Sequence, residues 1–295
     1  MKKRLLLTCS GGETSMFMVL WCWNNLQEHY NMMIVFANTG QEDNETLEFI
    51  HKCEVEFNLP IVWIETKVHH GIRKSSSYTI VDYNTATRKN DWINTEYTPF
   101  EQVIKKYNLP NHSRLHCTRE LKMNPIKSYA KNKWGKRKYY LALGIRMDEF
   151  DRINSKANDL RIIYPLINKD MQPMTKKHIN FFWSNQPFRL NLKGYQGNCI
   201  TCYKKSNNKL YQIAQENPTA FLFFDSMEKK YGNVNGIVPD KKQVLPNEEY
   251  KNTIFRNFKT AKDILEESKL FDKEIIDDNI ETESCEIFSN CGDFE

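Results

Sequence analysis

The chain has 295 residues, and its 40% hydrophobic and 27% charged content supports a sizeable core and excludes a disordered polymer. No apolar run reaches the roughly 20 residues of a membrane span. The first residues, MKKRLLLTCSGG, lack the apolar length and the cleavage site of a signal peptide. We therefore expect a cytoplasmic protein without a membrane partner. The net charge of +5 fits an anionic substrate, a nucleotide or a nucleic acid, and it fits an ordinary solvated surface equally well.

Strands and helices are expected to alternate through the first half of the chain. The expected strands are residues 4–9, 32–37, 61–65 and 137–144, and the expected helices are residues 14–28, 42–57, 98–107 and 120–133. This alternation predicts an α/β fold with a parallel sheet of five or so strands flanked by helices. The polar stretch 68–98 is expected to form a loop or a short hairpin on the substrate side.

The strand pattern fades from about residue 186, and the remaining chain is expected to be a helical C-terminal extension. Further helices are expected at residues 176–185, 207–216 and 260–270. We therefore expect an α/β domain over residues 1–205 and a helical extension over residues 206–295, ending in an acidic tail that carries two cysteines.

A glycine-rich loop separates the first expected strand from the first expected helix. It consists of Ser10, Gly11, Gly12, Glu13, Thr14 and Ser15. Adjacent glycines let a backbone approach an oxyanion closely, and the N–H groups and dipole of a helix start favour negative charge. The loop matches neither the P-loop pattern nor GxGxxG. On these residues alone, a tight turn with a hydroxyl cap remains the alternative.

Two more motifs follow later strands: NTG at residues 38–40, with ET at 45–46, and GIRMDE at residues 144–149. Together with SGGETS they resemble the PAPS reductase-like branch of the adenine-nucleotide α-hydrolase (PP-loop) superfamily, as found in bacteria and phages. The resemblance covers about residues 4–206 and implies a PP-loop (HUP-type) fold. It also implies an adenine nucleotide bound at the carboxyl ends of the strands, where open α/β sheets bind ligands.

The resemblance assigns most of the site. The implied nucleotide-binding residues are Ser10, Gly11, Gly12, Thr14, Ser15, Asn38, Thr39, Gly40, Gly144 and Arg146. Arg146 is also a catalytic candidate, because its planar fork suits phosphate or sulfate oxygens. Thr14 stands where the commoner motif has Asp, which leaves open whether hydrolysis is retained. Arg119 and Lys122 are further anion-binding candidates, with ordinary surface charges as the alternative.

The eight cysteines are too sparse for a disulfide scaffold. Cys22 and Cys53 fall in apolar helical patterns and are expected in the core. Cys199 and Cys202 form a CxxC, which alone is ambiguous between a redox pair, a metal half-site and coincidence. In iron-dependent sulfonucleotide reductases of the same superfamily, a Cys-Cys pair precedes the CxxC by a number of residues similar to that between Cys117 and Cys199 here. The four thiolates of these reductases hold a 4Fe–4S cluster.

The resemblance therefore implies a 4Fe–4S cluster on three thiolates, those of Cys117, Cys199 and Cys202. His116 stands where the other cysteine would be, and three options remain for the fourth position: the His116 nitrogen, a tail cysteine, or an open iron. Zinc is the rival metal, since three Cys and one His are an ordinary zinc set, and free thiols are the third alternative. Lys204 and Lys205 are expected to compensate cluster charge or to contact a nucleic-acid phosphate.

The tail contains Cys285 and Cys291. The sequence around Cys291 (NCG) resembles the Glu-Cys-Gly element whose thiol attacks the sulfonucleotide in the reductases, which makes Cys291 a candidate catalytic nucleophile. The following His of that element is missing, and a tail with incidental or metal-binding cysteines is the alternative.

The resemblance implies a phosphoadenosine phosphosulfate reductase-like enzyme that binds PAPS, APS or ATP for sulfonucleotide reduction or sulfur transfer. Its expected partners are the nucleotide, a thiol reductant such as thioredoxin or a sulfur donor, and a nucleic acid; Mg²⁺ is expected if ATP is the substrate. The alternatives are an ATP-dependent sulfur transferase acting on nucleic acid, of the phosphorothioation or thiolation type, and a non-catalytic nucleotide-binding regulator.

Overall fold

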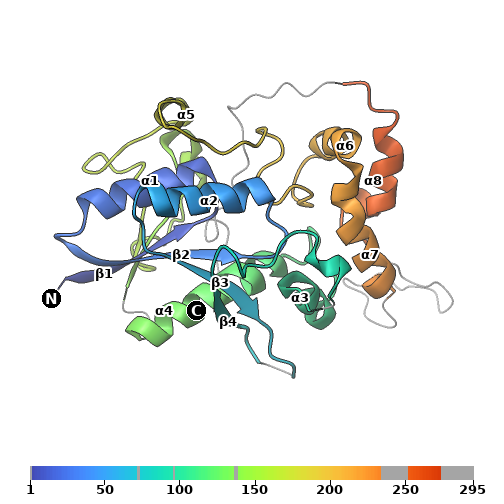
Figure 1. Ribbon diagram of the computed structural model, residues 1–295, viewed down its shortest axis with the longest axis horizontal. Helices are drawn as coiled ribbons and strands as arrows, with labels where there is room; N and C mark the ends of the chain where they lie inside the picture. Colours follow the sequence, from blue (N-terminus) through green and yellow to red (C-terminus); the bar gives the residue numbers. More distant parts are fainter. Residues whose placement is uncertain (1, 72–73, 96, 136–138, 234–251, 274–295) are drawn as a thin grey trace.

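A six-stranded sheet forms the centre of the computed structural model, which describes residues 2–71, 74–95, 97–135, 139–233 and 252–273. The strand order is β4-β3-β2-β1-β5-β6, and neighbouring strands are parallel except for β4, which runs antiparallel to β3 at one edge (Figure 1). The strands are β1 (Lys3–Cys9), β2 (Tyr30–Asn38), β3 (Ile61–Lys67), β4 (Ser77–Val81), β5 (Tyr140–Ala142) and β6 (Ile162–Ile163).

Helices cover both faces of the sheet, which explains why its central strands are apolar throughout. Leu5 and Leu7 of β1 pack on the face covered by α1, α2 and α5, whereas Leu6 between them packs on the face covered by α4 (Figure 1). The helices of this α/β part are α1 (Glu13–Asn25), α2 (Asn44–Glu56), α3 (Pro99–Tyr107), α4 (Asn124–Trp134) and α5 (Lys176–Ser184).

Short helical segments link these elements. A π-helix, η2 (Thr118–Met123), leads directly into α4, and single π turns of this kind are frequent at functional sites. The 3₁₀ segments are η1 (Asp91–Ile93), η3 (Met147–Arg152), η4 (Pro218–Phe221) and η5 (Arg256–Phe258).

Three helices of the C-terminal part, α6 (Asn207–Glu216), α7 (Leu222–Tyr231) and α8 (Ala261–Ser268), gather beyond the end of the sheet (Figure 1). They share a second hydrophobic core with α3, in which the Phe100 ring lies 5.5 Å from Phe223 and 5.8 Å from Phe224. This core contains residues on both sides of position 205, so the division of the chain at that position stays a prediction.

The α/β class and the helical C-terminal part are confirmed, with differences in detail. The sheet has six strands rather than about five, because the polar stretch 68–98 contributes β4 and the pair Ile162–Ile163 forms β6. The strand expected at residues 137–144 is described as Tyr140–Ala142. The expected helix at residues 120–133 begins as the π-helix η2, and α7 was not predicted.

Two further findings bear on expectations from the sequence. Cys22 and Cys53 are fully buried, and burial raises the pKa of the Cys22 thiol to about 12 and that of Cys53 as well. Both thiols are therefore unreactive core groups. Among the residues that the structure describes, no helix combines the length and apolar character needed to cross a membrane.

Candidate functional site

The strand order reverses at β1, which has β2 on one side and β5 on the other. In an open α/β sheet, ligands bind at such a switch point, outside the carboxyl ends of the strands. The SGGETS loop follows β1, the NTG motif follows β2, and the GIRMDE motif follows β5. The fold thus brings the three predicted loops to one edge of the sheet.

Hydrogen bonds hold the SGGETS loop in a defined shape. The Ser15 hydroxyl accepts from the Ser10 N–H at 3.1 Å and from the Ser10 hydroxyl at 3.0 Å, and it donates to the Gly12 carbonyl at 2.9 Å. Gly11 has a φ of +94°, which favours glycine, and Gly12 is the N-cap of α1 without a side-chain hydrogen bond from the described residues. The start of α1 therefore presents backbone N–H groups to an anion.

Arg146 ties the loop after β5 to the start of α1. Its Nη1 donates to the Thr14 hydroxyl at 3.2 Å, and its Nε donates to Asp148 at 3.1 Å. The side chain is only 3% exposed, and Glu149 accepts from its backbone N–H at 3.3 Å. Thr14, the residue that replaces the commoner Asp, is thus a direct contact of the predicted anion-binding arginine.

The NTG motif shapes its loop through internal bonds. Asn38 is fully buried, and its Nδ2 donates to Glu65 at 2.6 Å and to the Thr87 carbonyl at 2.9 Å. Burial raises the pKa of Glu65, which also accepts hydrogen bonds from the backbone and hydroxyl of Thr87. Thr39 donates from its N–H and hydroxyl to Glu42 at 2.8 and 2.6 Å. A direct contact of this motif with a nucleoside stays a prediction.

Two residues at the site were missed by sequence reasoning. Glu42 lies two residues after the NTG motif and forms a buried ion pair with Lys122 of η2 at 3.3 Å, so the π-helix is bound to the β2–α2 loop. Asn198 directly precedes the CxxC; its Nδ2 donates to the Ser10 carbonyl at 2.7 Å, and its own carbonyl accepts from the Asp43 N–H. Their positions beside recognised motifs are the only signal in the sequence.

The predicted cysteine ligands come from neighbouring segments. The Cys117 thiol lies 3.3 Å from the hydroxyl of Tyr203, the residue after Cys202, and Lys205 donates to the Cys199 carbonyl at 2.9 Å. Lys205 is buried, so its ammonium is held against the CxxC turn. Cys199 also pairs with Glu42 in an isolated β-bridge, which places the CxxC against the NTG loop.

His116 has the properties of a neutral ligand. Burial and the charge of Arg119 lower its pKa to about 4, and its Nε2 is buried without a hydrogen-bond partner in the described structure. Nevertheless, in the described ranges no three His, Cys, Asp or Glu side chains are placed to hold one metal ion together. Cys285 and Cys291 lie outside the described residues. The structure therefore does not assemble the predicted metal set.

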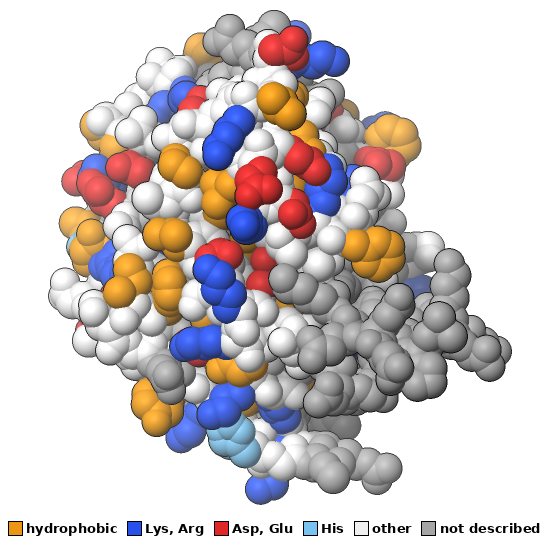
Figure 2. Space-filling model, turned by 90° about the vertical axis from the view of Figure 1, so that its right-hand side faces the viewer, with side chains coloured by type: hydrophobic (Ala, Val, Ile, Leu, Met, Phe, Trp, Pro, Cys, Tyr) orange, Lys and Arg blue, Asp and Glu red, His pale blue; other side chains and the backbone are white. Residues whose placement is uncertain are grey.

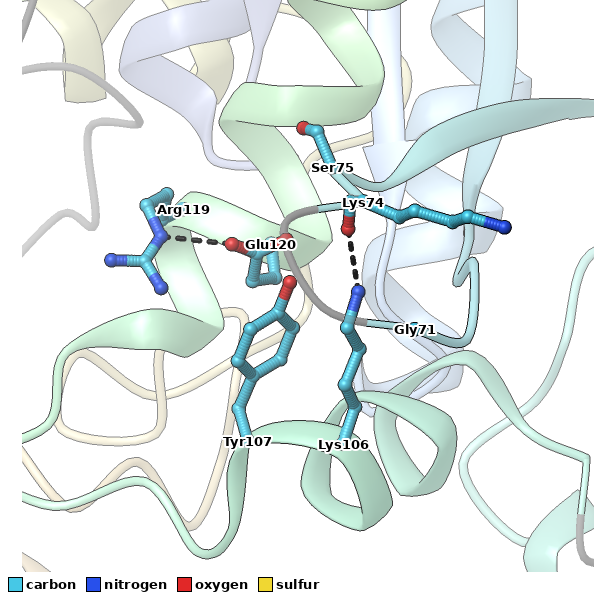
Figure 3. A pocket seen from close by; sticks show the side chains of 7 residues that line it. All are labelled: Gly71, Lys74, Ser75, Lys106, Tyr107, Arg119 and Glu120. Atoms are coloured by element: carbon cyan, nitrogen blue, oxygen red, sulfur yellow. Dashed lines mark hydrogen bonds and ion pairs between the residues drawn. The ribbon is translucent and has the colours of Figure 1, made fainter.

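A hollow of about 590 Å³ lies between α3, η2 and the turn that joins β3 to β4 (Figure 3). Arg119 pairs with Glu120 at 2.8 Å, and Lys106 donates to the Lys74 carbonyl at 2.6 Å. The residues that line it are Gly71, Lys74, Ser75, Lys106, Tyr107, Arg119 and Glu120. Three cations against one carboxylate suit an anionic group.

The face on the side of α6, α7 and α8 has an uneven charge distribution. In Figure 2, Lys and Arg side chains predominate in the lower part, at the height of the β3–β4 turn in Figure 1, while acidic side chains gather higher up. The cations of this face are thus grouped in its lower part, which favours contact with an anion there.

Comparison with known proteins gives two matches. A family model described as "Phosphoadenosine phosphosulfate reductase domain" matches residues 4–168, more than half of the chain, and ends before Cys199. Among curated proteins, the "Uncharacterized nin region protein ORF290" of Escherichia phage lambda is similar, with 26% identity over 205 residues that cover 70% of this chain and 67% of that protein. No solved structure matches the chain significantly.

Proposed function

The chain belongs to the phosphoadenosine phosphosulfate reductase domain family, a nucleotide-binding family of PP-loop proteins, and on that premise we propose that it is an enzyme of sulfur chemistry acting on an adenine nucleotide. The nucleotide is PAPS, APS or ATP, and its phosphate groups lie at the start of α1. Ser10, Gly11, Gly12, Thr14, Ser15, Asn38, Thr39, Gly40, Gly144 and Arg146 are the proposed nucleotide-binding residues.

One observation carries this proposal: the hydrogen bond between Arg146 and Thr14. It joins two motifs that are far apart in the sequence, at the switch point of the sheet and beside uncapped helix N–H groups. A buried guanidinium next to a glycine loop supports binding of phosphate or sulfate oxygens, because Arg offers several donors in a fixed plane.

In a reductase, the Cys291 thiolate attacks the sulfur of the sulfonucleotide, the bond between sulfur and the phosphate oxygen breaks, and adenosine phosphate leaves. A dithiol such as thioredoxin then supplies two electrons and releases sulfite from the S-sulfocysteine. Arg146 and the N–H groups of α1 would stabilise negative charge on the leaving phosphate.

We further propose that Cys117, Cys199 and Cys202 hold a 4Fe–4S cluster, with zinc as the rival metal. Support comes from the proximity of Cys117 to Tyr203 and from Nε2 of the neutral His116, which has no hydrogen-bond partner among the described residues. A cluster would supply a site for sulfur chemistry. Binding requires the three thiols to turn toward one another, because they are not grouped in the structure.

A second candidate is ATP-dependent sulfur transfer to a nucleic acid, with Mg²⁺ as the nucleotide's counter-ion. The specific observation in its favour is the cationic hollow of Figure 3, whose Arg119 lies two residues after Cys117. Lysine and arginine side chains of this kind neutralise the phosphates of a nucleic acid. A non-catalytic nucleotide-binding regulator is the third candidate, favoured by the uncharged Thr14.

A turnover assay tests the enzyme proposal. Protein purified without oxygen is incubated with a thiol reductant and with PAPS, APS or ATP, and sulfite, AMP and pyrophosphate are measured. Release of sulfite supports the reductase, and release of AMP and pyrophosphate from ATP supports the transferase. Arg146→Met is expected to lower kcat/KM by about a hundredfold. Lys262→Met, which removes an exposed surface cation of α8, is expected to leave it unchanged. If none of the three nucleotides is consumed, the enzyme proposal fails.

A further inference from the structure

Lys176 is a buried cation beside the proposed nucleotide site. It is the first residue of α5 and is only 8% exposed, although lysine is almost never fully buried unless it is paired. In the part of the chain that the structure describes, no hydrogen bond or ion pair joins its Nζ to another residue. Its neighbour Lys177 is exposed, so the two adjacent lysines differ in environment.

A chain of hydrogen bonds places Lys176 next to the start of α1. Its backbone N–H donates to Asp148 Oδ1 at 3.2 Å, and the same oxygen accepts from Arg146 Nε at 3.1 Å. Arg146 in turn reaches the Thr14 hydroxyl. On the other side, the Trp183 indole of α5 donates to the Glu13 carbonyl at 3.0 Å, which fixes the two helices relative to each other.

The acidic groups around Lys176 already have arginine partners. Glu13 forms a bidentate pair with Arg189, with both distances at 3.0 Å. Asp148 pairs with Arg146, and Glu149 pairs with Arg152 at 2.7 Å. Three carboxylates are therefore matched by three arginines, and Lys176 adds a positive charge that none of them neutralises at close range.

A cation on a largely buried side chain is costly when no counter-charge lies close to it, because burial weakens its hydration. Consistent with this, burial lowers the pKa of Lys176, and the neighbouring charges of Glu13 and Arg146 act on it in opposite directions. The cost falls when an anion enters the site. The surplus charge and the N–H groups of α1 would act on the same anion.

We propose that Lys176 is a phosphate-binding residue of this protein, whose ammonium pairs with phosphate or sulfate oxygens of the nucleotide at the start of α1. The proposal rests on the proposed nucleotide site and adds a cation that no motif indicated. Lys176 is proposed to contact the phosphate or sulfate groups of the nucleotide and not its adenosine.

Equilibrium titration of the full-length protein with adenosine, AMP, ADP, ATP, APS and PAPS tests this role. Lys176→Met is expected to weaken binding of at least one phosphorylated nucleotide by roughly 10- to 100-fold and to leave adenosine binding unchanged. Lys177→Met is the matched control on the same helix, and its affinities should equal those of the wild type. Lys176→Arg should restore most of the lost affinity, because it restores the charge.

The outcomes separate the two proposals. If the wild type binds none of these nucleotides, the proposed function fails. If the wild type binds and Lys176→Met binds equally well, or loses adenosine and phosphorylated nucleotides in the same proportion, the role of Lys176 is overturned. Thermal melting is measured for each variant, with Lys176→Gln as a second neutral substitution. If both neutral variants fail to fold, Lys176 is a structural residue and the proposal is overturned as well.

Discussion

At the scale of single residues, Gly11 is the position where the loop tolerates least change. Its φ is +94°, and a Cβ placed on it would lie 2.4 Å from Cγ2 of Thr46 on α2. Gly11→Ala must therefore shift the loop or the helix, and we expect it to weaken nucleotide binding about tenfold or more. Titration with the nucleotide that the wild type binds measures the loss.

Gly12→Ala is the matched control for that substitution. Gly12 has a φ of −93°, and its added Cβ would meet the Asn198 side chain at an ordinary 3.8 Å. Because Gly12 is itself a proposed nucleotide-binding residue, we expect a smaller loss of affinity than for Gly11→Ala, caused by contact of the added methyl group with the nucleotide and not by a shift of the loop. Equal affinities for the two alanine variants would show that the shape of the loop does not determine binding.

Residues within motifs could be predicted from the sequence, whereas residues that act across the fold could not. The glycine loop and Arg146 were identified because their motifs are local. Glu42, Asn198 and Lys176 were missed because their roles depend on contacts with segments distant in the chain. No pattern around Lys176 distinguishes it from the exposed Lys177, since only the packing of α5 buries one and not the other.

At the scale of elements, the sequence predicts long periodic segments better than short ones. The buried runs of β1, β2 and β3 and the amphipathic helices α2 and α3 were predicted with ends within a few residues. β6 has two residues, too few to show any alternation. In α7, the run of aromatic residues at its start obscures the helical period.

The two cysteine segments make the cluster proposal testable at this scale. We expect anaerobically purified protein to be brown, with broad absorbance in the blue region and with iron and sulfide bound. Cys199→Ala should abolish the colour, because it removes one of the three proposed ligands. Cys22→Ala, which changes a buried thiol of α1, should retain the colour. Colourless protein with stoichiometric zinc would instead identify the rival metal.

At the scale of the whole molecule, the C-terminal helices are bound to the α/β part by buried charges as well as by the core shared with α3. Glu101 of α3 is 1% exposed and accepts from Lys230 and from the Tyr231 hydroxyl, both at 3.1 Å. These contacts place α7 beside α3. Through the neighbouring η2, α3 is connected to Glu42 after the NTG motif, and Glu42 pairs in turn with Cys199 of the CxxC. We therefore expect loss of stability in the C-terminal helices to disturb the candidate functional site as well.

Glu228 of α7 stabilises the fold of the C-terminal helices through buried hydrogen bonds. It is 4% exposed, and its two carboxylate oxygens accept from the backbone N–H groups of Ile254 at 3.1 Å and Ala261 at 2.8 Å. Glu228→Gln turns one acceptor into an NH₂ group that faces an N–H donor, so one buried hydrogen bond is lost. We expect the free energy of unfolding to fall by about 1–3 kcal/mol, measured by denaturant titration.

Asp225→Asn on the same helix is the control for Glu228→Gln. Asp225 pairs with the exposed Lys229 on the surface, and exposed pairs of this kind contribute about 0–1 kcal/mol. Each substitution removes one negative charge from α7. A larger fall in the free energy of unfolding for Glu228→Gln than for Asp225→Asn would therefore come from the buried hydrogen bonds and not from the change in charge. Equal losses in the two variants would mean that the carboxylate of Glu228 does not hold the segments before and within α8 in place.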